Sequence, residues 1–317
     1  MNWKQPKVYA VKHKNENVRA ESRSGGIFSA LSDKVLESNG VVYGCTLNEQ
    51  LVAIHSRAED IETRNQMRGS KYVQSHLGEV FKSVRKDIDS GRKVLFSGTS
   101  CQIAGLKKFL GYERENLICI DIVCHGVPSP KLWRSYLSWQ NRKNRASTTK
   151  VDFRNKRDYG WSDHVETLTM GAKSIDSRVY TAIFYSHCAM RPCCYECPFK
   201  SITHPADITI ADYWGIDKAA PGFNDNKGVS LVLINNDKGE RIFEEVKPSI
   251  TWCQTKIEDS MQPPLIKAYS PPANREEFWN DMSKDNFDIV AKKYGNYSVK
   301  NVIKWKIGKI RRKLKLK

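Results

Sequence analysis

Residues 94–130, VLFSGTSCQIAGLKKFLGYERENLICIDIVCHGVPSP, contain two apolar strands, each followed by a turn and a helix. The apolar run 94–96 predicts a short buried strand, and a helix is expected over 102–110. Residues 117–123 form the second apolar run, and Pro130 begins the next helix. This order of strand, helix, strand and helix predicts parallel strands joined by crossover helices. Both turns therefore follow carboxyl ends of strands, where open α/β sheets bind their ligands.

The rest of the chain extends this alternation on both sides, without an internal repeat. We expect a mixed α/β (α+β) fold in which residues 1–145 form a lobe of sheet with crossover helices. Residues 146–298 are expected to form a strand-rich second lobe that packs on the first, and residues 299–317 a basic helical tail. Strands are predicted at 7–13, 41–45, 51–55, 150–154, 164–170, 208–213, 229–234 and 250–253, and helices at 27–38, 77–88 and 239–246.

The composition excludes several classes of protein. The 317 residues contain 52 Lys and Arg against 35 Asp and Glu, a formal net charge of +17, and 40% are hydrophobic. These ordinary globular values exclude wholesale disorder and fibrous repeats. No apolar run approaches the roughly 18 residues that span a bilayer, and the first 26 residues lack the apolar core of a secretory signal. We therefore expect a cytoplasmic protein.

Half of the net charge lies in residues 300–317, which contain nine Lys or Arg and no acid. The apolar residues of this segment recur at three- and four-residue steps, which predicts a basic amphipathic helix. Such a helix fits an anionic membrane surface at the inner face of the membrane; the alternative is a solvated helix on its own domain. Nucleic-acid binding is not expected, because no stacking motif accompanies the charge. The apolar positions are Val299, Val302, Ile303, Ile307, Ile310 and Leu314.

A cysteine-rich segment, HCAMRPCCYECPFK at 187–200, is the sharpest local feature. Cys194 and Cys197 form a C-x-x-C turn, in which two thiolates can converge on one metal ion or on a corner of an iron–sulfur cluster. Cys188 and Cys193 are their neighbours. Three interpretations of this segment stay open: a zinc knuckle, an iron–sulfur cluster and unliganded thiols. We refer to residues 187–200 as the cysteine loop.

Cysteines elsewhere in the chain bear on this choice. The sequence has no second knuckle of the kind that a structural zinc site uses. Instead, Cys101 and Cys124 each stand alone at the end of a buried strand, and Cys101 also precedes a helix whose amides would stabilise a thiolate. An iron–sulfur cluster is wider than one zinc ion and can collect such separated ligands. The remaining thiols are expected to be small buried side chains: Cys45, Cys119 and Cys253.

Two polar loops are candidates for binding an anionic cofactor. Ser24, Gly25 and Gly26 precede a helix, and glycines at a helix N-terminus allow a phosphate to approach the backbone N–H groups. The loop 68–72 adds Ser70, Lys71 and Tyr72. Each loop also has a simpler explanation, an ordinary turn in the first case and a solvated loop in the second.

Several motifs together resemble the coenzyme F420 hydrogenase/dehydrogenase beta subunit family. They are SGGIFSAL at 24–31, RGSKYVQS at 68–75, FSGTSCQIAGL at 96–106, DIVCHGVPSP at 121–130, RPCCYECPFK at 191–200 and ADITIADYWGI at 206–216. The resemblance covers about residues 7–220. It implies an iron–sulfur flavoprotein, in which one [4Fe-4S] cluster lies beside an FAD and electrons pass between reduced deazaflavin coenzyme F420, or ferredoxin, and a substrate.

The resemblance also implies roles for particular residues. Cys101, Cys124, Cys194 and Cys197 correspond to the cluster ligands. The FAD would be bound by Ser24, Gly25, Gly26, Ser70, Lys71, Tyr72 and Thr99, and Asp212 and Tyr213 would approach the flavin. His125 is expected to transfer a proton or to hydrogen-bond the cluster, with a backbone-bonded turn histidine as the alternative.

The sequence departs from many relatives in one respect. The ferredoxin-like module of repeated cysteines, with which they begin, has no counterpart in these 317 residues. We therefore expect a separate electron donor, a ferredoxin-like protein or soluble deazaflavin, unless the chain is a fragment. The expected function is a cytoplasmic oxidoreductase of unknown substrate, and the resemblance also implies a link to surface polysaccharide biosynthesis. The alternative is a non-catalytic zinc or iron–sulfur scaffold that docks on a membrane-associated assembly.

Overall fold

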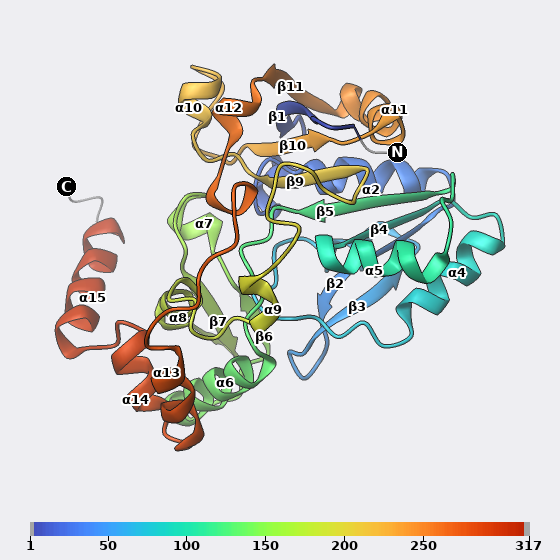
Figure 1. The fold of residues 1–317 in the computed structure, drawn as a ribbon. Coiled ribbons are helices and arrows are strands. Elements are labelled where there is room, and N and C mark those ends of the chain that lie inside the picture. The colour runs from blue at the N-terminus through green and yellow to red at the C-terminus, as the bar shows by residue number, and fades with distance from the viewer. Residues whose placement is uncertain (1–2, 314–317) are drawn as a thin grey trace.

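Two β-sheets organise the computed structural model, which describes residues 3–313 (Figure 1). The larger sheet has eight strands in the order β11-β1-β10-β9-β5-β4-β2-β3, and the smaller has the order β6-β7-β8. The mixed α/β class is confirmed. The strands are β1 (Lys7–His13), β2 (Val41–Leu47), β3 (Ala53–Ala58), β4 (Val94–Thr99), β5 (Leu117–Ile122), β6 (Lys150–Asp152), β7 (Glu166–Met170), β8 (Lys173–Ser177), β9 (Ile208–Asp212), β10 (Ser230–Ile234) and β11 (Ile250–Thr255).

Four neighbouring strands, β2, β4, β5 and β9, run parallel at the centre of the larger sheet. The parallel arrangement predicted from residues 94–130 is thus confirmed, and α5 (Ser100–Leu110) is the crossover between β4 and β5. The remaining strands pair antiparallel with their neighbours. The carboxyl ends of β2, β4, β5 and β9 therefore meet at one edge of the sheet, which we call the carboxyl edge.

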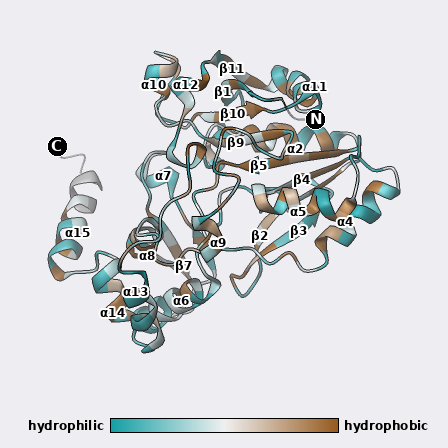
Figure 2. Cartoon of the chain, viewed as in Figure 1, coloured by the Kyte–Doolittle hydropathy of each residue, from teal (hydrophilic) through white to brown (hydrophobic). Residues whose placement is uncertain are grey.

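Helices cover both faces of this sheet. On one face lie α2 (Ile27–Glu37) and α11 (Asp237–Val246), and on the other lie α4 (Val80–Asp89) and α5. Each helix turns an apolar stripe towards the strands, as its spacing predicts. Figure 2 shows the central strands as largely hydrophobic, with hydrophilic residues on the helices outside them. The core residues of α2 are Ile27, Ala30, Leu31 and Val35, and those of α5 are Ile103, Leu106 and Leu110.

The larger sheet crosses the lobe boundary that the sequence predicts at residue 145. β9 comes from the second half of the chain, yet it pairs parallel with β5 through Ile120 and Ile208 and antiparallel with β10. β10 and β11 then enclose β1. Without these strands β5 would be an edge with unpaired N–H and C=O groups, which is unfavourable in a buried sheet. The two halves of the sequence therefore build one sheet.

The smaller sheet packs with helices around a second core. These helices are α6 (Pro130–Asn144), α8 (Val179–Tyr185), α13 (Arg275–Ser283) and α14 (Phe287–Tyr294). The sequence analysis predicted α6 but not α8, α13, α14 or β8. Glu166 is buried here, and its charge is stabilised by hydrogen bonds from the Tyr136 hydroxyl, the Tyr180 amide and the Thr181 hydroxyl at 2.8–3.1 Å.

Short helices connect these elements, and one long helix follows them. The short ones are α1 (Glu16–Glu21), α3 (Ile61–Asn65), α7 (Lys156–Tyr159), α9 (Pro192–Tyr195), α10 (Ile216–Ala219) and α12 (Ile257–Ser260), with 3-10 turns at Lys247–Ser249 and Pro263–Leu265.

α15 (Val299–Lys313) extends away from the body of the molecule (Figure 1). A helix is thus present where the basic tail was predicted. Val299, Ile303 and Ile307 are 78%, 52% and 47% exposed and recur every four residues, so an apolar stripe faces solvent. The predicted positions Val302, Ile310 and Leu314 lie outside the described side chains. Among the described helices, none combines the length and apolar character needed to cross a membrane.

Gly25 fits where α2 begins because it has no side chain. A Cβ atom on Gly25 would lie 2.1 Å from the carbonyl oxygen of Val11 and 2.6 Å from the amide nitrogen of Ser230, both in strands of the sheet. Backbone atoms of paired strands cannot move aside cheaply. Close packing against β1 and β10 is thus a sufficient reason for this glycine.

We predict that Gly25→Ala lowers the free energy of unfolding by about 3 kcal/mol, the upper part of the range for overpacking. Chemical denaturation measures this change. Gly105→Ala is the matched control, because its Cβ would meet only Phe81 at an ordinary 3.6 Å. Gly105 lies inside α5, where alanine should stabilise by about 0.5–1 kcal/mol. Equal effects of the two substitutions would contradict this account of Gly25.

His55 is a buried histidine that joins β3 to the end of β4. Its Nε2 lies 3.0 Å from the carbonyl oxygen of Ser97, and its ring stacks on Phe96 at 5.3 Å. Burial lowers the pKa of His55 to about 4. The folded protein therefore holds this ring neutral, whereas in the unfolded chain it binds a proton below about pH 6.5.

Because the unfolded state binds more protons between pH 6.5 and 4, we predict that stability falls as the pH is lowered through this window. His55→Gln should make the fall shallower by up to about 3 kcal/mol, since a pKa unit corresponds to about 1.4 kcal/mol. Denaturation at a series of pH values measures the slope. His76→Gln, at an exposed position, should keep the wild-type slope. An unchanged slope for His55→Gln would refute the assignment.

Candidate functional site

The first two cysteines of the site follow β4 and β5 at the carboxyl edge. Thr99 is the N-cap of α5, where its amide donates to Gln102 Oε1 at 2.9 Å, and its hydroxyl lies 3.1 Å from the Sγ of Cys101. Cys101 is exposed in the first turn of α5. Cys124 lies two residues beyond β5, and the Gly126 amide donates a hydrogen bond to its sulfur. Both cysteines are thus at strand ends, as predicted.

The cysteine loop is held against the turn that follows β5. Pro128 and Met190 form an antiparallel bridge, flanked by hydrogen bonds from the Arg191 amide to the Val127 carbonyl (3.1 Å) and from the Ser129 amide to the Ala189 carbonyl (3.0 Å). Lys200, at the end of the loop, donates to the carbonyl oxygen of Cys124. Segments that are far apart in the sequence are thereby joined through their backbones.

This pairing brings the four predicted cluster ligands into one region. Burial raises the pKa of Cys124 to about 12, with Cys194 and Cys101 adding to the rise. Burial also raises the pKa of Cys194, with smaller contributions from Cys193, Cys197 and Cys101. The Val127 amide opposes this rise by donating to the Cys194 sulfur. Two of the four sulfurs therefore accept backbone N–H groups, which is how proteins tune the thiolates of iron–sulfur sites.

The two neighbouring cysteines differ in environment. Cys188 is buried, and its thiol lies 3.4 Å from the Asn274 side-chain oxygen, whereas Cys193 is exposed. Within residues 3–313, no three or more His, Cys, Asp or Glu side chains are spaced to hold a single metal ion. The four sulfurs share a region without converging on one point.

A buried polar group that the sequence analysis missed connects the cysteine-bearing segments. His204 Nδ1 lies 2.9 Å from Asp121 Oδ2 in β5 and 3.2 Å from the hydroxyl of Ser100 in α5. All three residues are buried. His204 follows the cysteine loop, so it ties that segment to the strand before Cys124 and to the turn that carries Cys101. Nothing in the local sequence around His204 indicated this contact.

His125 lies among aromatic side chains beside Cys124. Its Nε2 is 2.7 Å from His187 Nε2, and the Tyr269 hydroxyl is 3.3 Å from its Nδ1. Phe184 and Tyr185 pack within about 5 Å of the ring. Burial, followed by the neighbouring His187, lowers the pKa of His125 to about 3. This low pKa keeps the predicted catalytic histidine neutral. The sequence analysis did not predict its contacts with His187 and Tyr269.

The loop 22–26 lies where α2 meets β10. The Ser24 hydroxyl donates to the Val229 carbonyl at 2.6 Å, and the Gly25 amide donates to the Ser230 hydroxyl at 2.9 Å. Gly26 has a φ of +94° and is the N-cap of α2. These contacts give the loop a structural role, while the first turn of α2 remains near the carboxyl edge.

The second predicted loop packs beside the first. Arg68 Nε donates to the Ser29 hydroxyl in the first turn of α2 at 2.9 Å, which joins the two loops. Lys71 donates to the carbonyls of Gln66 and Arg68, and burial lowers its pKa to about 8. Ser70 precedes it, and the Tyr72 hydroxyl accepts a hydrogen bond from Arg154 at 3.3 Å. The structure thus brings the two loops together.

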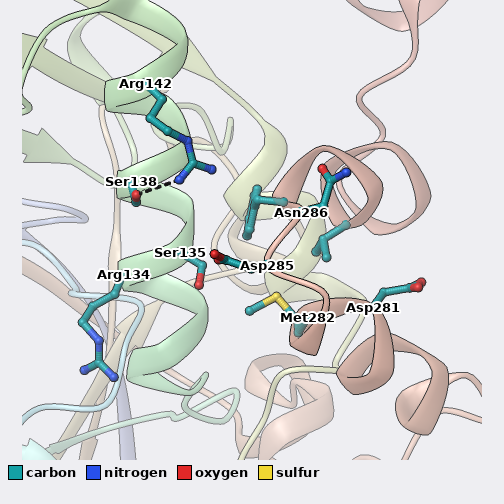
Figure 3. Close-up of a pocket in the computed structure, with 10 residues that line it drawn as sticks. Arg134, Ser135, Ser138, Arg142, Asp281, Met282, Asp285 and Asn286 are labelled. Carbon is teal, nitrogen blue, oxygen red and sulfur yellow. Dashed lines mark hydrogen bonds between the residues drawn. The ribbon is translucent and has the colours of Figure 1, made fainter.

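A separate cleft lies between α6 and the pair α13 and α14 (Figure 3). Arg134 and Arg142 of α6 line one wall, and Asp285 lies on the opposite side. Phe287 and Val290 also line it. None of the site residues predicted from the sequence belongs to this cleft.

The comparisons with known proteins agree with the resemblance of the motifs. A family model for the C terminus of the coenzyme F420 hydrogenase/dehydrogenase beta subunit matches residues 91–259, which include the four cysteines. A solved chain of the xenon-derivatised F420-reducing [NiFe] hydrogenase complex from Methanosarcina barkeri has a similar fold, with a TM-score of 0.54 and 16% identity over 93% of this chain and 94% of that chain. No curated protein matches the sequence. Because the family model spans more than half of the chain, the protein belongs to the coenzyme F420 hydrogenase/dehydrogenase beta subunit family, a family of oxidoreductase subunits.

Proposed function

We propose that the protein is an iron–sulfur flavoprotein oxidoreductase that uses one [4Fe-4S] cluster and one FAD. It would pass electrons between a reduced carrier, coenzyme F420 or a ferredoxin, and a substrate. The family supports redox chemistry in general. One observation carries the finer proposal: Cys101, Cys124, Cys194 and Cys197 come from three segments but share one region at the carboxyl edge.

The chemistry of this region supports the proposed cluster. Two backbone amides already donate to the sulfurs of Cys124 and Cys194, so these thiolates would be stabilised when the cluster is bound. The ammonium group of Lys200 lies beside Cys124 and favours negative charge on it. An iron–sulfur cluster supplies one-electron transfer and a flavin supplies hydride transfer.

The surroundings of the cysteines also support a flavin and a proton carrier. Ser24, Gly25 and Gly26 precede the first turn of α2, whose amides suit a phosphate. Ser70, Lys71, Tyr72 and Thr99 complete the proposed FAD residues. His125 is the proposed catalytic residue, since the hydrogen bonds with His187 and Tyr269 give a proton a path beside the cluster.

The proposed electron donor is a separate protein or soluble carrier. The similar fold of a chain in a multi-subunit hydrogenase supports the existence of partner subunits. We place the protein in the cytoplasm, where α15 would hold it against the inner face of the membrane. The motif resemblance also favours a role in surface polysaccharide biosynthesis.

We predict about four irons and one FAD per chain after anaerobic purification. Cys101→Ser, Cys124→Ser, Cys194→Ser and Cys197→Ser should each lose most of the iron, because each removes a ligand. Metal, sulfide and flavin analysis together with the absorption spectrum measures this. Cys253→Ser is the control, as this thiol lies in β11 outside the cysteine region, and it should keep its iron.

Two further variants test whether a neighbouring cysteine is a cluster ligand in place of one of the four proposed. Cys193→Ser and Cys188→Ser should retain the cluster if the four proposed ligands are correct. One zinc per chain, no flavin and indifference to Cys101→Ser would reject the oxidoreductase and leave the scaffold as the function.

The exposed face of α15 supports contact with an anionic membrane, a role that the scaffold alternative also requires. Val299, Ile303 and Ile307 face solvent, and the exposed Lys300 and Lys304 lie beside them. An apolar stripe flanked by lysines suits the boundary between acyl chains and anionic headgroups. Each lysine near such a surface contributes about 1 kcal/mol.

We predict that the Lys300→Glu/Lys304→Glu variant binds vesicles of mixed phosphatidylserine and phosphatidylcholine at least about tenfold more weakly than the wild type, because two attractions become repulsions. Co-sedimentation with vesicles measures binding. Lys108→Glu/Lys131→Glu, which reverses two exposed lysines outside α15, should retain it. Similar losses in both double variants would show that net charge, and not α15, drives binding.

A further inference from the structure

Three basic side chains gather beside the loop that precedes α2. Arg23, Arg154 and Lys156 form this group, which we call the cationic cluster. The side chains of Arg23 and Arg154 are only 13% and 3% exposed. Burial, and then the charge of Arg154, lowers the pKa of Arg23 to about 10. Burial, and then the charges of Arg23 and Arg19, lowers the pKa of Lys156 to about 7. The three charges therefore lie close enough to repel one another.

The hydrogen bonds of the cationic cluster are incomplete. The Nε and Nη2 atoms of Arg23 and the Nε atom of Arg154 are buried and have no hydrogen-bond partner among the described residues. The carboxylate paired with Arg23 is Asp152, which is 55% exposed and lies 3.9 Å from Nη1. A buried N–H group without an acceptor costs free energy, and more so when it is charged. These donors point to an acceptor that the chain does not itself supply.

Two nearby carboxylates are already paired with arginines. Asp212 accepts a hydrogen bond from Arg154 through Oδ2, and Asp225 pairs with Arg19. Lys156 donates to the carbonyls of Arg19, Ser22 and Ser24 at 2.8–3.2 Å, so its charge is not neutralised by an acid. Positive charge therefore exceeds negative charge in a largely buried place.

Aromatic side chains continue from this cluster towards the cysteines. Arg154, Tyr72, His164 and Tyr185 line a cavity of about 10 Å³, which is room for roughly one water molecule. The Tyr185 ring in turn packs 5.2 Å from that of His125, next to Cys124.

We propose that Arg23 and Arg154 bind a phosphate or pyrophosphate group of a ligand. The planar guanidinium group donates to two phosphate oxygens at once, which suits the unpartnered N–H atoms. Asp212 Oδ1, also buried and unpartnered within the described residues, accepts from a hydroxyl or N–H group of the same ligand. Arg157 and the other exposed arginines take no part.

The phosphate has two possible sources, the flavin nucleotide and a phosphorylated substrate. Only the first source rests on the proposed function. Inorganic phosphate and pyrophosphate are the probes. Each is titrated calorimetrically, at constant ionic strength, into the full chain as purified and into the full chain after flavin removal. Iron and flavin contents are measured on the same samples, so a failure of the proposed function is recorded separately.

We expect the flavin-free chain to bind pyrophosphate and Arg23→Gln to bind it about tenfold more weakly or worse, as expected for a lost charge-assisted hydrogen bond. Arg23→Lys should recover part of the affinity. The control Arg157→Gln removes an arginine that is 78% exposed in neighbouring α7 and should bind as the wild type does. Without phosphate, Arg23→Gln should unfold at an equal or higher temperature, because it removes a largely buried charge whose hydrogen bonds are incomplete.

Each outcome either supports or overturns the proposed phosphate site. Binding that persists in the flavin-loaded chain assigns the site to a phosphorylated substrate, and binding lost on flavin loading assigns it to the flavin phosphate; both support the site. If the purified protein contains no flavin, the binding of pyrophosphate still tests the site. Absence of binding in the flavin-free wild type, or equal binding by Arg23→Gln and Arg157→Gln, overturns the proposal.

Discussion

The candidate site depends on the parallel pairing of β4, β5 and β9. Parallel strands that are neighbours end at the same edge of a sheet, so the turns after β4 and β5 present Cys101 and Cys124 to one region. β9 adds Asp212 at the same edge. The backbone pairing of residues 127–129 with 189–191 then adds the cysteine loop. Strand pairing and loop pairing together join the three cysteine-bearing segments.

Buried charged groups in this protein differ in whether the chain itself completes their hydrogen bonds. Glu166 is buried and accepts three hydrogen bonds, and Asp207 accepts from the Cys119 amide and the Asn236 side chain. These groups are satisfied by the chain itself, and their role is to hold the fold. The side chain of Arg23 is 13% exposed, and two of its nitrogen atoms are buried without a hydrogen-bond partner among the described residues. The contrast is what marks the cationic cluster as a binding site rather than a part of the core.

The local sequence pattern predicted individual strands and helices, but it did not predict which of them pair with one another. The strand at 7–13 and the helix that begins at Ile27 were both predicted, because apolar spacing and glycine turns report on the nearest few residues. The lobe boundary at residue 145 does not coincide with a boundary of the larger sheet, since β9 pairs with a strand from the first half of the chain. The contacts of His204, His187 and Tyr269 were not predicted, because their partners also lie far away in the sequence.

By itself, the sequence determined the fold class, the positions of most central strands and the cysteines and glycines that stand at their ends. Motif order was also enough to indicate the family, because the motifs fall at turns whose residue types are restricted by the backbone. Only the tertiary structure decided which segments meet. It placed β9 beside β5, the cysteine loop against the turn after β5, and the three residues of the cationic cluster, Arg23, Arg154 and Lys156, together. The reason is physical, since strand pairing and charge burial depend on contacts between residues far apart in the chain, and local composition does not record them.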